Sequence, residues 1–209
     1  MKLIIARPSP YARKARIALI EKGIEFETII ENPWLPETNV PSANPLGKVP
    51  ALILGDGRVV HDSKVIVEYL ETLGIPPALI PTPPELRVAH KQIEAVADGV
   101  CDAVVLIALE RSRPAAMQSA DWIERQRRKI MAGTAELSRL LGEREWFTDA
   151  GFGLAEVAAG CTLGYLDLRF PEFDWRASAS NLERLYTRLS ARPSFAQTKP
   201  EPQELPTTR

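Results

Sequence analysis

A proline-dense stretch, Gly74–Pro84, separates two parts of this chain whose hydrophobic patterns differ, and no other feature constrains the fold as much. Before it, short apolar runs alternate with helical patterns; after it, there are helical patterns and no clear strand. Proline-rich segments are stiff and extended, which is typical of linkers. We therefore predict an α/β domain over residues 1–74, a linker over residues 75–84 and an all-helical domain over residues 85–209.

The first domain opens with a β-α-β pattern. The two predicted strands are the short β-rich run Lys2–Ala6 and the segment Glu25–Ile30. Between them, Ser9 and Pro10 mark a helix start, because Ser is a favoured N-cap and Pro suits the first helical position, and Gly23 marks the helix end. Such crossovers are nearly always right-handed, so we expect two parallel neighbouring strands.

The domain continues with a hairpin and a second helix. Ala51–Leu54 and Arg58–Val60 flank Gly55-Asp56-Gly57, a tight-turn signal. Asp62-Ser63 then opens a helix that ends at Gly74. The whole order predicts a mixed sheet of about four strands with helices packed on it.

The second part of the chain contains four long helical patterns, over Glu85–Arg113, Ala120–Leu141, Leu154–Leu166 and Ser180–Arg192. The last begins with Ser180-Asn181-Leu182-Glu183, a capping-box pattern that predicts Ser180 as the N-cap. The third is apolar nearly all round, so we expect it at the buried centre of the helical domain. The tail after Phe195 is polar and contains proline, which predicts a loosely ordered end.

Charge and cysteine content narrow the possible functions. The chain has 26 basic and 27 acidic residues, so it has no net field to gather nucleic acid or an anionic membrane. It has no signal-peptide pattern and no run near the ~18 apolar residues of a membrane span, so we expect a cytoplasmic protein. Cys101 and Cys161 lie far apart and without metal-ligand spacing, which predicts buried free thiols and no metal site.

Asn44–Pro50 leads into the strand Ala51–Leu54 and has two interpretations. It is either a plain turn entering a strand or a binding segment. Pro50 obliges Val49 to be extended, and the small trans preference of an X–Pro bond allows a cis Val49–Pro50 bond. Such a bond would turn the Val49 amide and carbonyl outward, where they can pair with another peptide as in β-augmentation.

Four segments taken together, in order and spacing, identify a family: Ser9–Lys14, Asn44–Pro50, Asp62–Ile66 and Arg192–Phe195. With the α/β-then-helical layout, the chain resembles a soluble bacterial glutathione S-transferase with a serine-type active site, over nearly its full length. The resemblance implies a thioredoxin-like domain with a four-stranded mixed sheet, followed by a helical-bundle domain. It also implies a cytoplasmic homodimer with a role in detoxification.

The resemblance implies a transferase that binds glutathione as co-substrate, stabilises its thiolate with Ser9 and conjugates it to a small electrophile. A thiol with a pKa of about 8.5 is mostly protonated at neutral pH. A hydroxyl that donates to the sulfur, beside the positive end of a helix, lowers that pKa. The alternative is that Ser9 is only an N-cap. Arg13, one turn on, either adds positive field or is a solvated helix residue, and we favour the second.

The resemblance assigns the rest of the glutathione site to Lys48, Val49, Pro50, Asp62 and Ser63. It makes Val49 the clamp for the cysteinyl part of glutathione, so we now expect the Val49–Pro50 bond to be cis. Only one residue of the Asp62-Ser63 pair can be the helix N-cap, which leaves the other free at an anion-binding helix N-terminus suited to the γ-glutamyl end. Lys48 is a candidate for the glycine carboxylate, or a solvated loop lysine.

The electrophile is expected to meet the middle of the first long helix, where Val104, Ile107 and Arg111 share a stripe. Val104 and Ile107 are equally explained as core residues, the interpretation we prefer. Arg111 either receives an anionic group or pairs with a neighbouring acid.

Gly153-Leu154-Ala155-Glu156 departs from the family, whose members usually have Ser or Thr, then Asp three residues later, as a capping box. Gly153 has no side chain to contribute. Glu156 can still accept from the Gly153 amide, so we expect half of the motif to survive.

Two other functions stay open. One is a glutathione-dependent isomerase or reductase on the same scaffold. The other is a non-enzymatic interaction protein of this fold, which the joint presence of Ser9, Val49-Pro50 and Asp62-Ser63 disfavours.

Overall fold

The computed structural model describes residues 1–203, and they form two compact units. The first consists of Met1–Leu79 together with Arg192–Gln203, and the second of Ile80–Ala191. Each unit has its own core and is described by itself.

The first unit is built on a four-stranded sheet with the order β2-β1-β3-β4. Its strands are β1 (Lys2–Ile5), β2 (Glu27–Ile30), β3 (Ala51–Ile53) and β4 (Val59–His61). β1 pairs with β2 in parallel and with β3 antiparallel, and β3 pairs with β4 antiparallel. The predicted mixed sheet is therefore confirmed.

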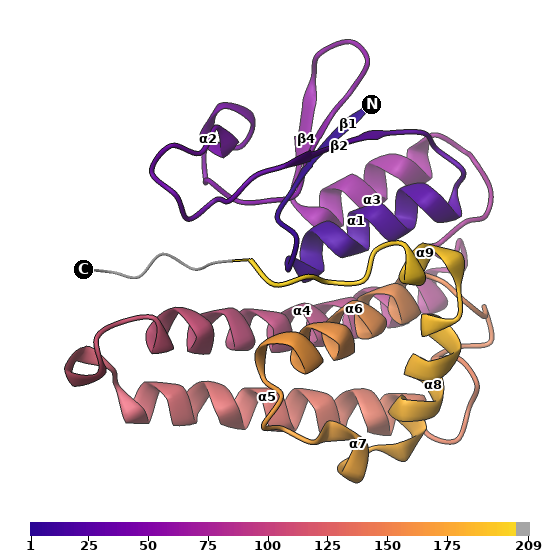
Figure 1. Cartoon of the computed structure of the whole chain (residues 1–209). Helices are drawn as coiled ribbons and strands as arrows, with labels where there is room; N and C mark the ends of the chain where they lie inside the picture. Colours follow the sequence, from indigo (N-terminus) through magenta and orange to yellow (C-terminus); the bar gives the residue numbers. More distant parts are fainter. Residues whose placement is uncertain (204–209) are drawn as a thin grey trace. The chain divides into compact units, whose positions relative to one another are not determined.

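Three helices cover this sheet: α1 (Pro10–Glu21), α2 (Val40–Ala43) and α3 (Ser63–Thr72). α1 and α3 lie side by side (Figure 1). Ile4 packs with Val40 of α2, so by alternation Leu3 and Ile5 face the opposite side of the sheet. Short α2 lies in a segment whose sequence is too irregular for a helix to be predicted.

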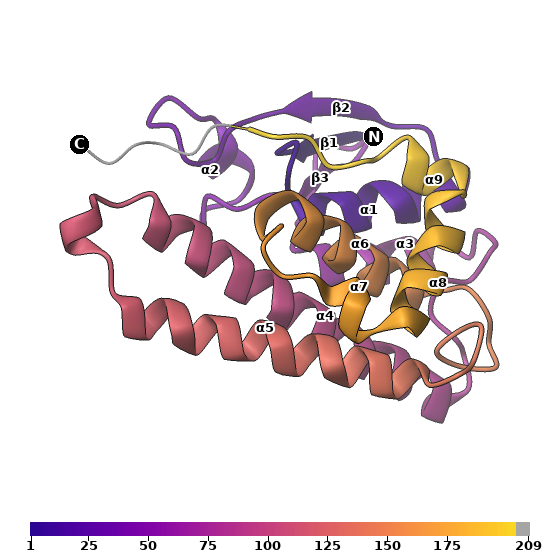
Figure 2. The same ribbon diagram turned by 60° about the horizontal axis from the view of Figure 1, so that its bottom comes forward.

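Within residues 80–191, the regular elements of the second unit are all helices. Its elements are α4 (Pro84–Arg111), the short 3-10 helix η1 (Ala115–Met117), α5 (Ala120–Leu141), α6 (Leu154–Arg169), α7 (Trp175–Ser178) and α8 (Ser180–Ser190). α4 and α5 form a long hairpin and α6 packs on α4 (Figures 1 and 2). Leu154–Leu166 is buried along its whole length, as its all-round apolar character predicts. Cys101 and Cys161 are buried thiols and form no disulfide within the described residues, as predicted.

The C-terminal segment differs from the prediction. Arg192–Gln203, which includes α9 (Pro193–Ala196), belongs to the first unit and not to a helical domain spanning residues 85–209. Arg192 binds Glu21 of α1 with Nη2–Oε2 and Nε–Oε1 distances of 2.7 and 3.0 Å. The described residues after Phe195 are not loosely ordered either, because Gln203 accepts from the Arg7 amide at 2.9 Å and donates to the Glu31 carbonyl at 3.1 Å; the rest of the predicted tail, residues 204–209, lies outside the described residues. Polar side chains thus attach this segment to the first unit where the sequence suggests only a polar tail.

No helix within residues 1–203 combines the length and the apolar character needed to cross a bilayer. Within the same residues there is no group of three or more His, Cys, Asp or Glu placed to hold a metal ion.

Candidate functional site

Ser9 opens α1 as its N-cap. Its backbone is extended (φ −64°, ψ 117°) and its Oγ accepts a hydrogen bond from the Ala12 amide at 3.1 Å. The turn before it is closed by the Ser9 amide, which donates to the Ala6 carbonyl at 3.1 Å. Because Oγ accepts the capping bond, the hydroxyl proton stays available to donate to a ligand. Ser9 thus offers a donor at the positive end of a helix.

The second part of the site is the loop before β3. The Val49–Pro50 bond is cis, which confirms the prediction. Among the described residues, the backbone N–H and carbonyl of half-buried Val49 have no hydrogen-bond partner. They are therefore free to pair with an extended peptide.

Asn44 holds that loop in shape, a role that the sequence analysis misses. Its buried side chain donates from Nδ2 to the Lys48 carbonyl at 2.9 Å and accepts at Oδ1 from the Leu46 amide at 3.1 Å. Gly47, between them, has φ 63°, which glycine adopts at no steric cost. The one signal in the sequence is an Asn that precedes Pro-Leu-Gly, a pattern typical of Asx turns.

The start of α3 is the third part. Asp62 is the N-cap, with Oδ1 accepting from the Lys64 amide at 2.8 Å, so Ser63 is the free member of the pair. Ser63 is buried, and among the described residues its hydroxyl has no hydrogen-bond partner. Within residues 1–203, Asp62 is the one residue other than glycine with positive φ, 73°. Such a conformation costs about 1–3 kcal/mol and is often found at functional sites.

Strand register brings these three parts to one end of the sheet. Ala51 is opposite both Ile4 and His61, so the end of β1, the start of β3 and the end of β4 coincide. Ser9 follows β1, Val49 precedes β3 and Asp62 follows β4. The sheet therefore gathers at one edge the residues that the sequence analysis selects from three distant segments.

Lys48, which the resemblance also assigns to the site, is exposed in the same loop. Arg13 is different from what we expect of a solvated helix residue, because it is only 4% exposed. Its Nη2 donates to the Phe195 carbonyl at 3.3 Å, its Nε donates to Thr198 Oγ1 at 3.4 Å, and its guanidinium lies 5.2 Å from the centre of the Phe195 ring. Helical spacing alone does not reveal this burial, since the covering residues come from the far end of the chain.

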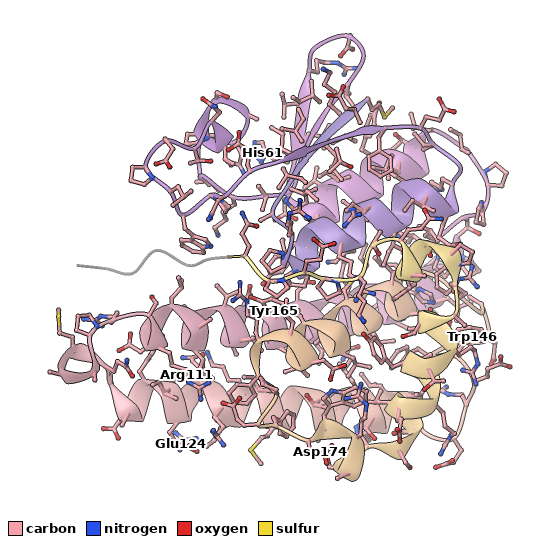
Figure 3. The ribbon with its side chains drawn as sticks, in the orientation of Figure 1. His61, Arg111, Glu124, Trp146, Tyr165 and Asp174 are labelled. Atoms are coloured by element: carbon pink, nitrogen blue, oxygen red, sulfur yellow. The ribbon has the colours of Figure 1, made fainter. Side chains whose placement is uncertain are left out.

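The proposed electrophile residues lie in the second unit. Val104 and Ile107 are each 1% exposed, which favours the interpretation that they are core residues. Arg111 pairs with Glu172 at 2.6 Å and stacks on Phe170, between α4 and α5 (Figure 3). Burial raises the pKa of Glu172, but hydrogen bonds, including the one from Arg111, bring it below its usual value. Of the two interpretations of Arg111, the structure thus presents the pairing with an acid.

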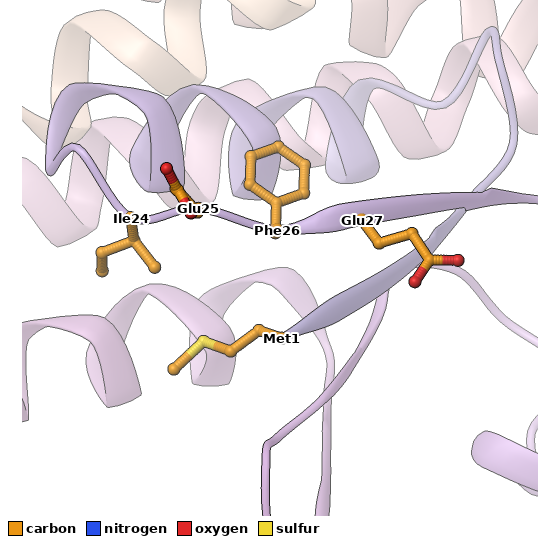
Figure 4. A pocket seen from close by; sticks show the side chains of 5 residues that line it. All are labelled: Met1, Ile24, Glu25, Phe26 and Glu27. Carbon is orange, nitrogen blue, oxygen red and sulfur yellow. The ribbon is translucent and has the colours of Figure 1, made fainter.

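A hollow of about 590 Å³ lies elsewhere in the first unit. Met1, Ile24, Glu25, Phe26 and Glu27 line it, and Figure 4 shows their side chains. These residues begin β1 and β2, whereas Ser9 follows the other end of β1. The hollow is therefore separate from the site at the opposite sheet edge.

The family is established by sequence comparison. Residues 8–73 match the model of the glutathione S-transferase N-terminal domain, and residues 120–188 match the model of the C-terminal domain. The chain therefore belongs to the glutathione S-transferase family.

Several relatives are similar over nearly the whole chain. A glutathione S-transferase from Methylobacterium radiotolerans JCM 2831, solved in complex with glutathione sulfonate, is 50% identical with a TM-score of 0.96, covering 100% of this chain and 98% of that one. One from Methylobacillus flagellatus KT, solved with GSH bound, is 42% identical with a TM-score of 0.92, covering 96% and 99%. The uncharacterized GST-like protein YibF of Escherichia coli (strain K12) is 40% identical over 200 residues, covering 96% and 98%.

Proposed function

We propose that this protein is a glutathione transferase that binds glutathione, stabilises its thiolate with Ser9 and conjugates it to a small electrophile. The observation that carries the proposal is the strand register, which gathers Ser9, Val49 and Asp62-Ser63 at one end of the sheet. The relatives solved with glutathione sulfonate and with GSH, which align over nearly the whole chain, support glutathione as the ligand.

Each part of the site has a chemical role in this proposal. Val49 pairs through its free amide and carbonyl with the cysteinyl part of the tripeptide, next to buried Pro50. The Ser63 hydroxyl and the α3 N-terminus hold the γ-glutamyl carboxylate, while the Asp62 carboxylate takes the ammonium group. Lys48 reaches the glycine carboxylate.

Ser9 acts on the reacting sulfur. Its hydroxyl donates to the thiolate, and the positive end of α1 adds field, so the thiol loses its proton to water at lower pH than the ~8.5 of a free thiol. A sulfur lone pair then forms the C–S bond to the electrophile. The electrons displaced leave with a departing anion, or remain on the electrophile and take up a proton.

A second candidate shares the first half of this chemistry. A maleylacetoacetate isomerase from Pseudomonas aeruginosa is 30% identical over 168 residues, covering 75% of this chain and 77% of that protein. In an isomerase, the thiolate adds and is later expelled, so glutathione is regenerated. Net consumption of glutathione separates the two, because a transferase consumes one thiol for each product and an isomerase consumes none. We also propose that the protein is a cytoplasmic homodimer, as is usual for the family.

The decisive experiment is a titration with glutathione followed by Ser9→Ala. Calorimetry with millimolar glutathione tests binding, and an absence of binding would favour an interaction protein instead. Ser9→Ala should leave binding nearly intact and raise the pKa of the bound thiol. Ser119→Ala is the matched control, since Ser119 is the N-cap of α5, with its Oγ accepting from the Trp122 amide at 3.2 Å. Both changes remove a cap worth about 1 kcal/mol, and only Ser9→Ala should change the thiol.

A further inference from the structure

The C-terminal segment Arg192–Gln203, here called the strap, runs antiparallel to α1 (Figure 1, yellow). It begins at the last turn of α1, where Arg192 and Ser194 both bond to Glu21. Burial raises the pKa of Glu21, but these bonds bring it below its usual value, so the carboxylate stays charged. The strap is thus anchored by an ion pair at its start.

The strap then follows α1 toward its first turn. Arg16 Nη2 donates to the Gln197 carbonyl at 3.1 Å, and Arg13 bonds to Phe195 and Thr198 as described above. The helix therefore contributes basic side chains that hold the strap along its length.

The strap ends on the turn that presents Ser9. Arg7 is the second residue of the turn Ala6–Ser9, and its side chain forms an ion pair with Glu201. The Arg7 amide donates to Gln203 Oε1 at 2.9 Å, and Gln203 Nε2 donates to the Glu31 carbonyl at 3.1 Å. One side-chain amide thus connects the residues that follow β1 and β2.

The side-chain amide of Gln203 lies where the next hydrogen bond of the β1–β2 ladder would form. The Glu31 amide donates to the Ile5 carbonyl at 2.8 Å, so in a continued parallel ladder the Arg7 amide would donate next to the Glu31 carbonyl. The Gln203 amide lies between those two groups and satisfies both. The orientation of the amide is determined, since the Arg7 N–H only donates and the Glu31 carbonyl only accepts. Gln203 therefore bridges the two segments that follow β1 and β2, just before Ser9, and holds them apart by the width of its side-chain amide.

We propose that Gln203 is a positioning residue for the Ser9 hydroxyl, an inference that rests on the proposed glutathione transferase function. By fixing Arg7 relative to β2, it fixes the turn that places Ser9 and the first turn of α1 beside the glutathione sulfur. Hydrogen bonds weaken steeply with misalignment, and the field of a helix terminus falls off within one turn, so a small displacement of Ser9 weakens thiolate stabilisation.

The test compares Gln203→Ala and Gln203→Glu with Lys199→Ala, a change at an exposed residue of the same strap. The carboxylate of Gln203→Glu accepts from the Arg7 amide but cannot donate to the Glu31 carbonyl. The pKa of the bound glutathione thiol is read from thiolate absorbance against pH, and kcat and KM are measured with an activated aryl chloride. Melting temperatures verify that each variant is folded.

We expect both Gln203 variants to raise the thiol pKa by about 0.5–1 unit, with kcat below that pKa lower by about 3- to 10-fold and KM for glutathione within about twofold. Activity should recover above the new pKa, which a merely structural defect would not produce. Lys199→Ala should behave as the wild type. A thiol pKa unchanged in Gln203→Ala, or shifted equally in Lys199→Ala, would overturn the inference.

A second measurement separates this inference from the function on which it rests. Hydrogen exchange without glutathione should be faster at the Arg7 and Ser9 amides in Gln203→Ala; unchanged exchange would overturn the positioning role even if the wild type forms thiolate. If wild-type protein with bound glutathione shows no thiolate at all, the proposed role of Ser9 fails, and the role of Gln203 fails with it.

Discussion

The imidazole Nδ1 of His90, on α4, accepts a hydrogen bond at 3.3 Å from the backbone amide of Ala155, in the first turn of α6. The N-cap of α6 is Gly153, which has no side chain for this purpose. Since Nδ1 accepts, the ring proton is on Nε2, which lies 2.8 Å from Thr148 Oγ1 and donates to it. A histidine from another helix therefore supplies the cap that the local sequence lacks.

His90→Phe should lower the free energy of unfolding by about 1–3 kcal/mol, because it keeps an aromatic ring but leaves the buried Ala155 amide unpaired. Urea unfolding measures the change. Val88→Ala, at an exposed position of the same helix, is the control and should stay within about 0.5 kcal/mol of the wild type. An equal loss in both variants would contradict the capping role.

The effect of His90 on the pH dependence of stability should become measurable once the titrating carboxyl group of Glu156 is replaced. Burial lowers the pKa of His90 from 6.5 to about 4, so the unfolded chain binds a proton that the folded one does not, and stability falls as pH drops from about 6.5 toward 4. Burial raises the pKa of Glu156 from 4.5 to about 7, so this group adds stability as pH drops over a similar range. The two contributions oppose each other in the wild type.

Glu156→Gln removes the second contribution, so its stability should fall by about 2 kcal/mol more than that of the wild type between pH ~6.5 and ~4.5. Urea titrations across this range measure the difference. Glu143→Gln alters an exposed carboxylate and should run parallel to the wild type. If the free energy of unfolding of Glu156→Gln also ran parallel to that of the wild type across this pH range, His90 and Glu156 would not have opposing contributions.

The variant Glu156→Ala should affect stability and not ligand binding. In the wild type, the two carboxylate oxygens of Glu156 accept from the Phe147 and Gly153 amides, both at 2.8 Å. The bond from Gly153 confirms the half of the capping box that the sequence predicts. Losing both acceptors should cost about 2–4 kcal/mol. Glutathione affinity, measured by calorimetry, should stay within about twofold, because the proposed site is in the other unit. An unchanged melting temperature would refute the structural assignment.

Two helical glycines should respond to alanine with opposite signs. A Cβ at Gly133 would lie 2.4 Å from Val100 Cγ2, and Val100 is a buried, β-branched residue with little rotamer freedom. Gly133→Ala should therefore destabilise by about 1–3 kcal/mol. A Cβ at Gly99 meets nothing within 4 Å, so Gly99→Ala should stabilise by about 0.5–1 kcal/mol through helix propensity. Thermal or urea unfolding of the pair checks this, and equal signs would contradict the packing of α4 on α5.

The local sequence predicts the first half of the site well. The Ser-Pro start of α1 and the hairpin between β3 and β4 are recovered because each depends on neighbours within a few residues. The cis Val49–Pro50 bond is also confirmed, but it is predicted from the order of the segments that resemble the family, since the local sequence allows both isomers. The start of α8 was predicted less well: Ser180 is expected as N-cap, whereas the structure has Ala179 there, and Asn181 bonds instead to the Ser138 and Gly142 carbonyls at the end of α5. A tertiary contact has replaced a local one.

By itself, then, the sequence determines the two-part layout and the order of the main strands and helices along the chain, since hydrophobic period and turn residues act locally. It also contains the four segments that resemble the glutathione S-transferase family. Tertiary structure decides the rest. It makes Asp62 the cap and leaves Ser63 free, buries Arg13 under Phe195, brings His90 to a helix that lacks its own cap, and places Gln203 between the residues that follow β1 and β2. Each of the last three is a contact between residues more than 60 positions apart, at 182, 65 and up to 196 residues, where no local propensity reaches.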